Sequence, residues 1–159
     1  MIRDFIKNLD IEFYEDISLK RYNTYRLEVI AKYLVFPGNK DDLKGLIMFF
    51  KKENVKYVVL GNGSNVIFAS DYYDGVVILL NKFKNLNING NLIEAEAGYF
   101  LPKLAIEVSK MGLGGLEFAA AIPGFVGASV AMNAGAYNSS MEEVVESVLV
   151  LDEEYNFVV

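Results

Sequence analysis

Residues 117–137 read EFAAAIPGFVGASVAMNAGAY. Apart from Glu117 at its start, no residue of this segment carries a charge. Small residues let a backbone approach another group closely, and glycine also permits left-handed dihedral angles. The segment ends in Asn133 and Tyr137, whose side chains can hydrogen-bond a ligand. The pattern indicates a backbone surface laid against a large flat partner or, alternatively, a close-packed turn between a helix and a strand.

A membrane-spanning helix is not expected in this segment. The apolar run from Phe118 to Met132 is shorter than the ~18 residues that a span needs, and Pro123-Gly124 interrupts it. The N-terminal residues carry an acid early and lack an apolar core of signal-peptide length. We therefore expect no membrane partner.

Length and composition indicate a globular chain with a substantial core. A chain of 159 residues suits one domain or two small lobes, and such a chain can bury roughly 70% of its unfolded surface. The hydrophobic fraction of 53% and mean hydropathy of +0.25 argue against disorder. A net charge of −6 without a basic stripe argues against a nucleic-acid partner. Cysteine and histidine are absent, so we expect no disulfide framework and no metal site, which is compatible with a reducing cytosol.

Hydrophobic periodicity predicts a strand, a helix and a second strand between residues 31 and 60. Residues 31–36 form an apolar run that ends at Pro37-Gly38. Residues 41–52 carry apolar side chains at helical spacing, with acids at the start and lysines at the end. Residues 56–60 form another short apolar run bounded by Gly61. This order is consistent with a βαβ unit.

The second half of the chain begins with a further strand, at residues 76–80, and a hairpin around Asn89-Gly90. A helix is expected from Pro102 to Gly112, and a strand from about 144 to 151 that pairs with 157–159. The composition changes near residues 81–85. We therefore predict two lobes, 1–82 and 83–159, of which the second is incomplete at its C-terminal end.

A glycine-rich loop follows the strand at 56–60. Two glycines at the end of a strand allow a tight turn whose backbone amides point outward together, and such a nest binds anions. The loop lacks the spacing of a P-loop and of a Rossmann turn, and an ordinary turn is the alternative interpretation. If the loop binds an anion, the natural ligand is a phosphate or pyrophosphate. Its residues are Gly61, Asn62, Gly63, Ser64 and Asn65.

Six short motifs appear in a fixed order along the chain: NTYR (23–26), LGNGSN (60–65), EAG (96–98), GLEF (115–118), IPGFVG (122–127) and MNAGAY (132–137). In combination, this order closely resembles the UDP-N-acetylenolpyruvoylglucosamine reductases, the MurB flavoenzymes of peptidoglycan synthesis. The resemblance runs from about residue 15 to the end of the chain. It implies an α+β fold of the vanillyl-alcohol oxidase and p-cresol methylhydroxylase type, with two lobes and FAD between them.

The resemblance also implies which residues contact the cofactor. By the family pattern, the loop at 61–65 holds the FAD pyrophosphate, and Tyr137 lies near the flavin or the substrate. The remaining residues line the flavin side: Ile122, Pro123, Gly124, Gly127, Asn133, Gly135 and Ala136.

Three positions depart from the family pattern. Leu27-Glu28-Val29-Ile30 stands where a Gly-Gly pair usually follows Arg26, Ala128 replaces a second glycine, and Asn138 replaces the glycine that follows Tyr137. The first change puts the cofactor contacts of the N-terminal lobe in question. Asparagine tolerates positive φ, so we expect the turn at Asn138 to survive.

The implied activity is the NADPH-dependent, FAD-dependent reduction of an enolpyruvyl UDP-sugar. Family members are roughly twice as long, and their catalytic arginine, serine and glutamate match positions beyond Val159. We therefore expect no catalytic residue within this chain, a missing C-terminal substrate lobe, and self-association through the face that lobe leaves open. The alternative is a stand-alone or degenerate flavin-binding module without reductase activity.

Overall fold

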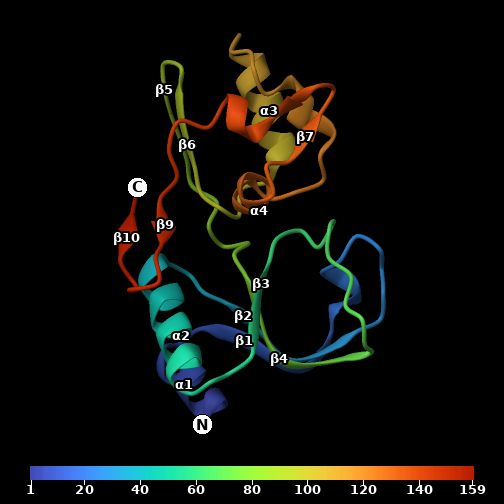
Figure 1. Cartoon of the computed structure of the whole chain (residues 1–159), viewed down its shortest axis with the longest axis vertical. Helices are drawn as coiled ribbons and strands as arrows, with labels where there is room; N and C mark the ends of the chain where they lie inside the picture. The colour runs from blue at the N-terminus through green and yellow to red at the C-terminus, as the bar shows by residue number, and fades with distance from the viewer. The chain divides into compact units, whose positions relative to one another are not determined.

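The computed structural model describes every residue from Met1 to Val159 and consists of two compact units. Unit 1 comprises Met1–Lys82 together with Leu149–Val159, and unit 2 comprises Phe83–Val148. Figure 1 shows the elements of each unit. None of the helices combines the length and the apolar composition that crossing a lipid bilayer requires. The division into lobes 1–82 and 83–159 stays a prediction.

Unit 1 is built on a four-stranded sheet with the strand order β1-β2-β4-β3. The strands are β1 (Glu12–Ser18), β2 (Ile30–Phe36), β3 (Tyr57–Leu60) and β4 (Tyr72–Leu79). β1 runs antiparallel to β2, whereas β2, β4 and β3 are parallel. The predicted strands at 31–36, 56–60 and 76–80 are confirmed, and β4 lies between the two strands of the expected βαβ unit.

Both faces of this sheet are buried, and β4 shows why. Val76 and Ile78 join the core on the side of α2 (Lys40–Lys52), where Leu46 is also fully buried. Val77 and Leu79 point to the opposite face. Alternate residues of a strand face opposite sides, so a strand covered on both faces is a continuous apolar run.

Helix α2 begins at a side-chain cap. The Asn39 Oδ1 atom accepts hydrogen bonds from the amides of Asp41 and Asp42, each at 2.9 Å. Acids occupy the first turn and lysines the last turn, which suits the helix dipole. The first helix, α1 (Ile2–Asn8), packs on the same face of the sheet (Figure 1) and buries Ile6.

Strand β1 was not expected from the sequence. It is an edge strand whose residues are mostly exposed, with the burial falling irregularly rather than on alternate residues. Such a segment lacks the period of two that identifies a half-buried strand. Its register against β2 is nevertheless regular, with Phe13 opposite Val35 and Tyr14 opposite Leu34.

Unit 2 contains the predicted hairpin and the predicted helix. Strands β5 (Leu86–Asn89) and β6 (Leu92–Ala95) are antiparallel, and Gly90 between them has φ +60°. Helix α3 (Leu101–Lys110) supplies the centre of the core. The chain continues through η2 (Glu117–Ala121), α4 (Val126–Ala131), β7 (Gly135–Ala136), β8 (Ser139–Ser140) and η3 (Met141–Glu143).

The predicted strand at 144–151 is wrong over most of its length. Only β9 (Val150–Leu151) is a strand, and it pairs with β10 (Phe157–Val158) as expected. The amides of Val144 and Val145, which follow η3 directly, both bond the carbonyl of Met141, the first residue of η3, at 3.1 and 2.9 Å. A turn therefore satisfies the backbone groups that a strand would have used for pairing.

Candidate functional site

The glycine-rich loop at 61–65 follows β3 directly, at the carboxyl end of that strand. Gly63 is buried and has φ +63°. A Cβ atom at this position would lie 2.3 Å from the Tyr22 carbonyl oxygen and 2.7 Å from the Asn23 Cα. Both the dihedral angle and the contact with another backbone segment therefore require glycine.

The NTYR motif supplies that neighbouring segment. The Thr24 amide donates a hydrogen bond to the Gly63 carbonyl oxygen at 3.0 Å. The Thr24 hydroxyl donates to the same oxygen at 3.3 Å. Two of the motifs singled out in the sequence, 39 residues apart, thus form one structure in unit 1.

These contacts orient the outer side of the loop. In a trans peptide the carbonyl of one residue and the amide of the next point in opposite directions. Because the Gly63 carbonyl faces Thr24, the Ser64 amide points away from Thr24. The amides of Ser64 and Asn65 donate no hydrogen bond within the chain. Adjacent free amides suit an anion such as a phosphate. Contact of this loop with the FAD pyrophosphate stays a prediction.

The loop at 122–125 in unit 2 lies against residues 97–101. The Val126 amide donates to the Tyr99 carbonyl, the Gly127 amide to the Ala97 carbonyl, and the Leu101 amide to the Gly124 carbonyl, each at 2.9 Å. The EAG and IPGFVG motifs are therefore hydrogen-bonded to each other.

Close packing within unit 2 accounts for two of the predicted site glycines. A Cβ atom on Gly127 would lie 2.6 Å from the Ala97 Cβ, and one on Gly124 would lie 2.6 Å from the Ser129 Oγ. At these two positions the structure supports the close-packed turn that the sequence left as an alternative. Contact of the same backbone with FAD stays a prediction.

Two charged side chains of α3, Lys103 and Glu107, contact the side chain of Tyr99. The Tyr99 carbonyl is the one that accepts from the Val126 amide. The Tyr99 hydroxyl donates a short hydrogen bond to Glu107, and the Lys103 Nζ lies 4.9 Å from the centre of the Tyr99 ring. Interaction with the Tyr99 hydroxyl and then with the Glu107 carboxylate raises the pKa of Lys103 above its ordinary value. The Tyr99 side chain is thus fixed at both its ring and its hydroxyl.

Tyr137 and Asn138 form the turn of the short hairpin β7–β8. Their φ angles are +54° and +62°, and Gly135 pairs with Ser140 on the two strands. Two central residues with positive φ characterise a type I′ turn. The expectation that Asn138 accepts this conformation is confirmed. Tyr137 is 84% exposed, and an aromatic residue held at positive φ is unusual.

Asn133 is tied into unit 2 by its side chain. Its Oδ1 atom accepts a hydrogen bond from the Glu142 amide at 3.0 Å, and its own φ is +44°. The oxygen that the sequence offered to a ligand is thus bonded within the chain. This bond connects the end of α4 to η3.

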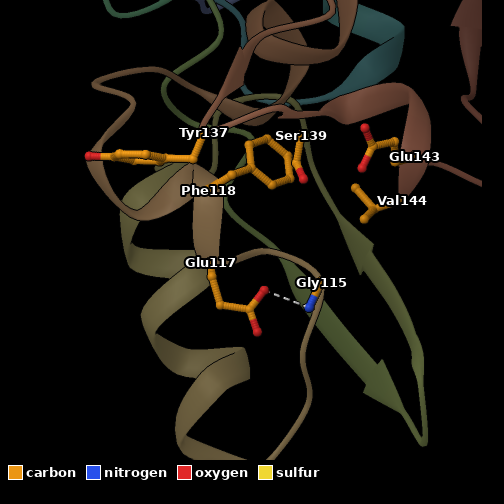
Figure 2. A pocket seen from close by; sticks show the side chains of 7 residues that line it. All are labelled: Gly115, Glu117, Phe118, Tyr137, Ser139, Glu143 and Val144. Carbon is orange, nitrogen blue, oxygen red and sulfur yellow. Dashed lines mark hydrogen bonds between the residues drawn. The ribbon is translucent and has the colours of Figure 1, made fainter.

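A pocket of about 480 Å³ lies beside the hairpin turn, a volume within the usual range for small-molecule sites. Figure 2 shows Tyr137 and Phe118 on one side and Glu143 with Val144 on the other. The Glu117 carboxylate accepts a hydrogen bond from the Gly115 amide at 2.8 Å. Of the lining residues, only Tyr137 was predicted. The sequence motif GLEF pointed to three others without assigning them a role. The lining residues are Gly115, Glu117, Phe118, Tyr137, Ser139, Glu143 and Val144.

The predicted site residues fall into two groups. The loop 61–65 lies in unit 1, and the predicted residues from Ile122 to Tyr137 lie in unit 2. Within each unit, the structure joins the predicted residues to a further motif: NTYR in unit 1 and EAG in unit 2.

Comparison with known proteins identifies the family. The FAD binding domain family matches residues 31–154. The chain belongs to this family. Its fold is the α+β FAD-binding domain of the p-cresol methylhydroxylase and vanillyl-alcohol oxidase type.

Several curated relatives share one name. A UDP-N-acetylenolpyruvoylglucosamine reductase of Caldicellulosiruptor bescii is 43% identical over 152 residues, which cover 96% of this chain and 48% of that protein. The reductase of Francisella tularensis is 42% identical over 140 residues, 87% of this chain and 48% of the relative. The chain is thus a homologue of the MurB reductases and spans about half of their length. The predicted resemblance is confirmed.

Solved structures agree. The MurB reductase of Thermus caldophilus superposes with a TM-score of 0.66 at 32% identity, over 82% of this chain and 45% of that one. A berberine bridge enzyme variant gives a TM-score of 0.57 at 14% identity, over 70% of this chain and 26% of that one, and shows likeness of fold alone.

The residues that replace the usual Gly-Gly pair are accommodated in unit 1. Val29 is 3% exposed and packs into the core on the face of the sheet opposite α2. The Glu28 carboxylate lies 3.5 Å from the Lys20 ammonium. The Leu19 amide bonds the Val29 carbonyl at 2.7 Å, so this segment is anchored without glycine.

Proposed function

We propose that this chain is the FAD-binding part of an NADPH-dependent reductase that converts UDP-N-acetylglucosamine enolpyruvate to UDP-N-acetylmuramate in peptidoglycan synthesis. The family match supports FAD as the cofactor. The shared name of the curated relatives supports a reductase that acts on a UDP-sugar. NADPH as the reductant follows from the resemblance to the MurB family alone. Such a reaction belongs in the cytoplasm, where NADPH is available.

One observation carries the cofactor proposal. The loop at 61–65 presents the free amides of Ser64 and Asn65 and is held in that conformation by Thr24. Backbone amides bind a pyrophosphate without needing a lysine, so the net charge of −6 is no obstacle. In unit 2, the backbone of 122–127 and the exposed Tyr137 would contact the isoalloxazine ring.

The division of labour follows from the residues present. Bound FAD would supply the hydride chemistry, accepting hydride from NADPH and delivering it to the enolpyruvyl double bond. This chain would bind and orient the cofactor. The groups that protonate the substrate and hold its carboxylate have no counterpart among the family motifs matched here.

Titration with FAD tests the proposal. We expect the purified protein either to contain flavin or to take it up saturably after removal, with quenching of flavin fluorescence. A folded protein that shows neither bound flavin nor saturable uptake would overturn the proposal.

A second candidate is a flavin-binding module without reductase activity. The observation that favours it is that the matching family model describes FAD binding and no further activity. NADPH oxidation with and without the UDP-sugar separates the two candidates for any longer protein that contains this chain. Substrate-dependent oxidation supports the reductase, and its absence at full flavin occupancy supports the module.

A further inference from the structure

The segment from Leu19 to Leu27 is organised by one buried side chain. Asn23 is 5% exposed. Its Nδ2 atom donates hydrogen bonds to the carbonyl oxygens of Leu19 at 2.8 Å and Leu27 at 3.0 Å. Its Oδ1 atom accepts from the Leu27 amide at 3.0 Å. A single amide group thus joins the two ends of this segment.

The segment would not keep its shape without these bonds. Arg26 has φ +58°, a conformation that costs free energy for a non-glycine residue and persists only where the surroundings impose it. The Arg26 amide bonds the Asn23 carbonyl at 3.3 Å. Asn23 therefore holds the turn through both its side chain and its backbone.

The shape of this segment decides where Gly63 lies. Thr24 bonds the Gly63 carbonyl twice, and Gly63 fits so closely against Tyr22 and Asn23 that no Cβ atom could be added. The orientation of the Gly63 carbonyl in turn fixes the direction of the Ser64 amide. A change in the turn at Asn23 would thus reach the anion-binding amides through two backbone contacts.

We propose that Asn23 and Thr24 are positioning residues for the phosphate loop: they contact no cofactor themselves but set the direction of the amides that bind the FAD pyrophosphate. This inference rests on the proposed binding of FAD. It assigns a function to the NTYR motif, to which the family resemblance gave no role in this chain.

The test compares Asn23→Ala and Thr24→Val with Leu46→Ala. Thr24→Val removes only the hydroxyl bond and keeps both the amide bond and the shape of the side chain. Leu46 is fully buried on α2, on the opposite face of the sheet from the 19–27 segment. Leu46→Ala therefore matches the loss of stability without touching the loop. All affinities are measured at a temperature where circular dichroism shows each variant to be folded.

We expect Asn23→Ala to weaken FAD binding by about tenfold or more, and Thr24→Val by about threefold, as the loss of hydrogen bonds that fix a binding group predicts. Leu46→Ala should stay within about twofold of the original protein. The ³¹P chemical shifts of the bound FAD pyrophosphate should move in Asn23→Ala and Thr24→Val but not in Leu46→Ala.

Distinct outcomes overturn distinct claims. If the unaltered protein takes up no FAD, the proposed function fails. If it binds FAD but folded Thr24→Val leaves both affinity and ³¹P shifts unchanged, the positioning role fails. The same holds if Leu46→Ala weakens binding as much as Asn23→Ala does. Should Asn23→Ala not fold, Thr24→Val still decides the question.

Discussion

Gly63 and Gly90 share a positive φ, +63° and +60°, but differ in their surroundings. A Cβ atom on Gly63 would collide with the backbone of Tyr22 and Asn23, whereas one on Gly90 would meet nothing within 4 Å. Replacing Gly90 by alanine should therefore lower the free energy of unfolding only by the cost of a left-handed conformation for a residue with a Cβ atom, about 1–2 kcal/mol. Gly63→Ala should lower the free energy of unfolding by more than this and should also displace the loop at 61–65.

The measurement is FAD affinity alongside urea unfolding for both variants. We expect Gly63→Ala, and more strongly Gly63→Val, to abolish saturable FAD uptake, while Gly90→Ala binds FAD as the original protein does. The added side chain would first meet the Tyr22 carbonyl rather than the pyrophosphate. Normal FAD titration into folded Gly63→Val protein would show that the loop assignment is wrong.

Tyr137 offers a second test at the level of one residue. Its side chain is 84% exposed and its φ is +54°, so it contributes little packing while occupying a costly conformation. Asparagine adopts positive φ more readily. Tyr137→Asn should therefore leave the free energy of unfolding unchanged or raise it by up to about 1 kcal/mol. If Tyr137 lies near the flavin, FAD affinity should fall.

The reference for Tyr137→Asn is Tyr155→Asn, which changes a tyrosine that also has positive φ, +63°, and that lies outside the predicted cofactor-binding residues. A loss of FAD affinity in Tyr137→Asn alone supports the assignment. Equal affinity in the two variants would place Tyr137 outside the cofactor site.

Single residues also show which contacts cannot be predicted from the sequence. The glycines of the phosphate loop and the Asn-Thr motif were both recognisable, but nothing in the spacing of Thr24 and Gly63 predicts that one bonds the other. Contacts of this kind depend on how β2, β3 and β4 are ordered in the sheet. The sequence order of the strands does not reveal that order, because β4 lies between β2 and β3.

At the scale of elements, helix α2 depends on its cap. The Asn39 side chain satisfies two amides of the first turn that no carbonyl within the helix can reach. Asn39→Ala should lower the free energy of unfolding of unit 1 by about 1 kcal/mol. Asn39→Ser keeps an oxygen acceptor without adding a charge next to Asp42, whose carboxylate accepts a hydrogen bond from the Asn39 side chain at 2.8 Å, and should lose less.

Urea unfolding of the two variants, followed by circular dichroism, checks this prediction. Similar losses in Asn39→Ala and Asn39→Ser would show that the cap bonds contribute little and that the packing of Leu46 and Phe50 decides the stability of α2. The cap follows the carboxyl end of β2, and the loop at 61–65 follows the carboxyl end of β3, which runs in the same direction, so both lie at the same edge of the sheet. FAD affinity is therefore measured in both variants alongside their stability.

The elements predicted successfully share a clear period or a fully buried run. Helix α2 has apolar residues at helical spacing, and β4 is apolar throughout from Val76 to Leu79. Strand β1 lacks both signals and was missed. The run at 144–149 has strand-forming residues but no neighbouring strand, and its first two amides bond the Met141 carbonyl at the start of η3 instead. The local sequence therefore predicts a helix or strand where buried residues recur regularly. It fails where the formation of a strand depends on pairing with a neighbouring strand.

At the scale of the whole molecule, each unit has its own core. The predicted cofactor residues are shared between the units, with the phosphate loop in unit 1 and the flavin-side residues in unit 2. Either unit alone would make only part of the contacts.

The last prediction concerns turnover. The chain as given should not reduce the enolpyruvyl UDP-sugar at a useful rate, even with FAD bound. Its MurB relatives are about twice as long, and none of the motifs matched here supplies the proton donor or the group that holds the substrate carboxylate. Absence of a positioned acid typically costs 10²- to 10⁴-fold in rate, roughly, and absence of groups that stabilise developing negative charge costs a further ~10²- to 10³-fold. NADPH oxidation should be measured with and without the UDP-sugar at matched flavin content, with the MurB reductase of Thermus caldophilus as the reference. Substrate-dependent turnover close to that of the reference would show that residues 1–159 contain the catalytic groups.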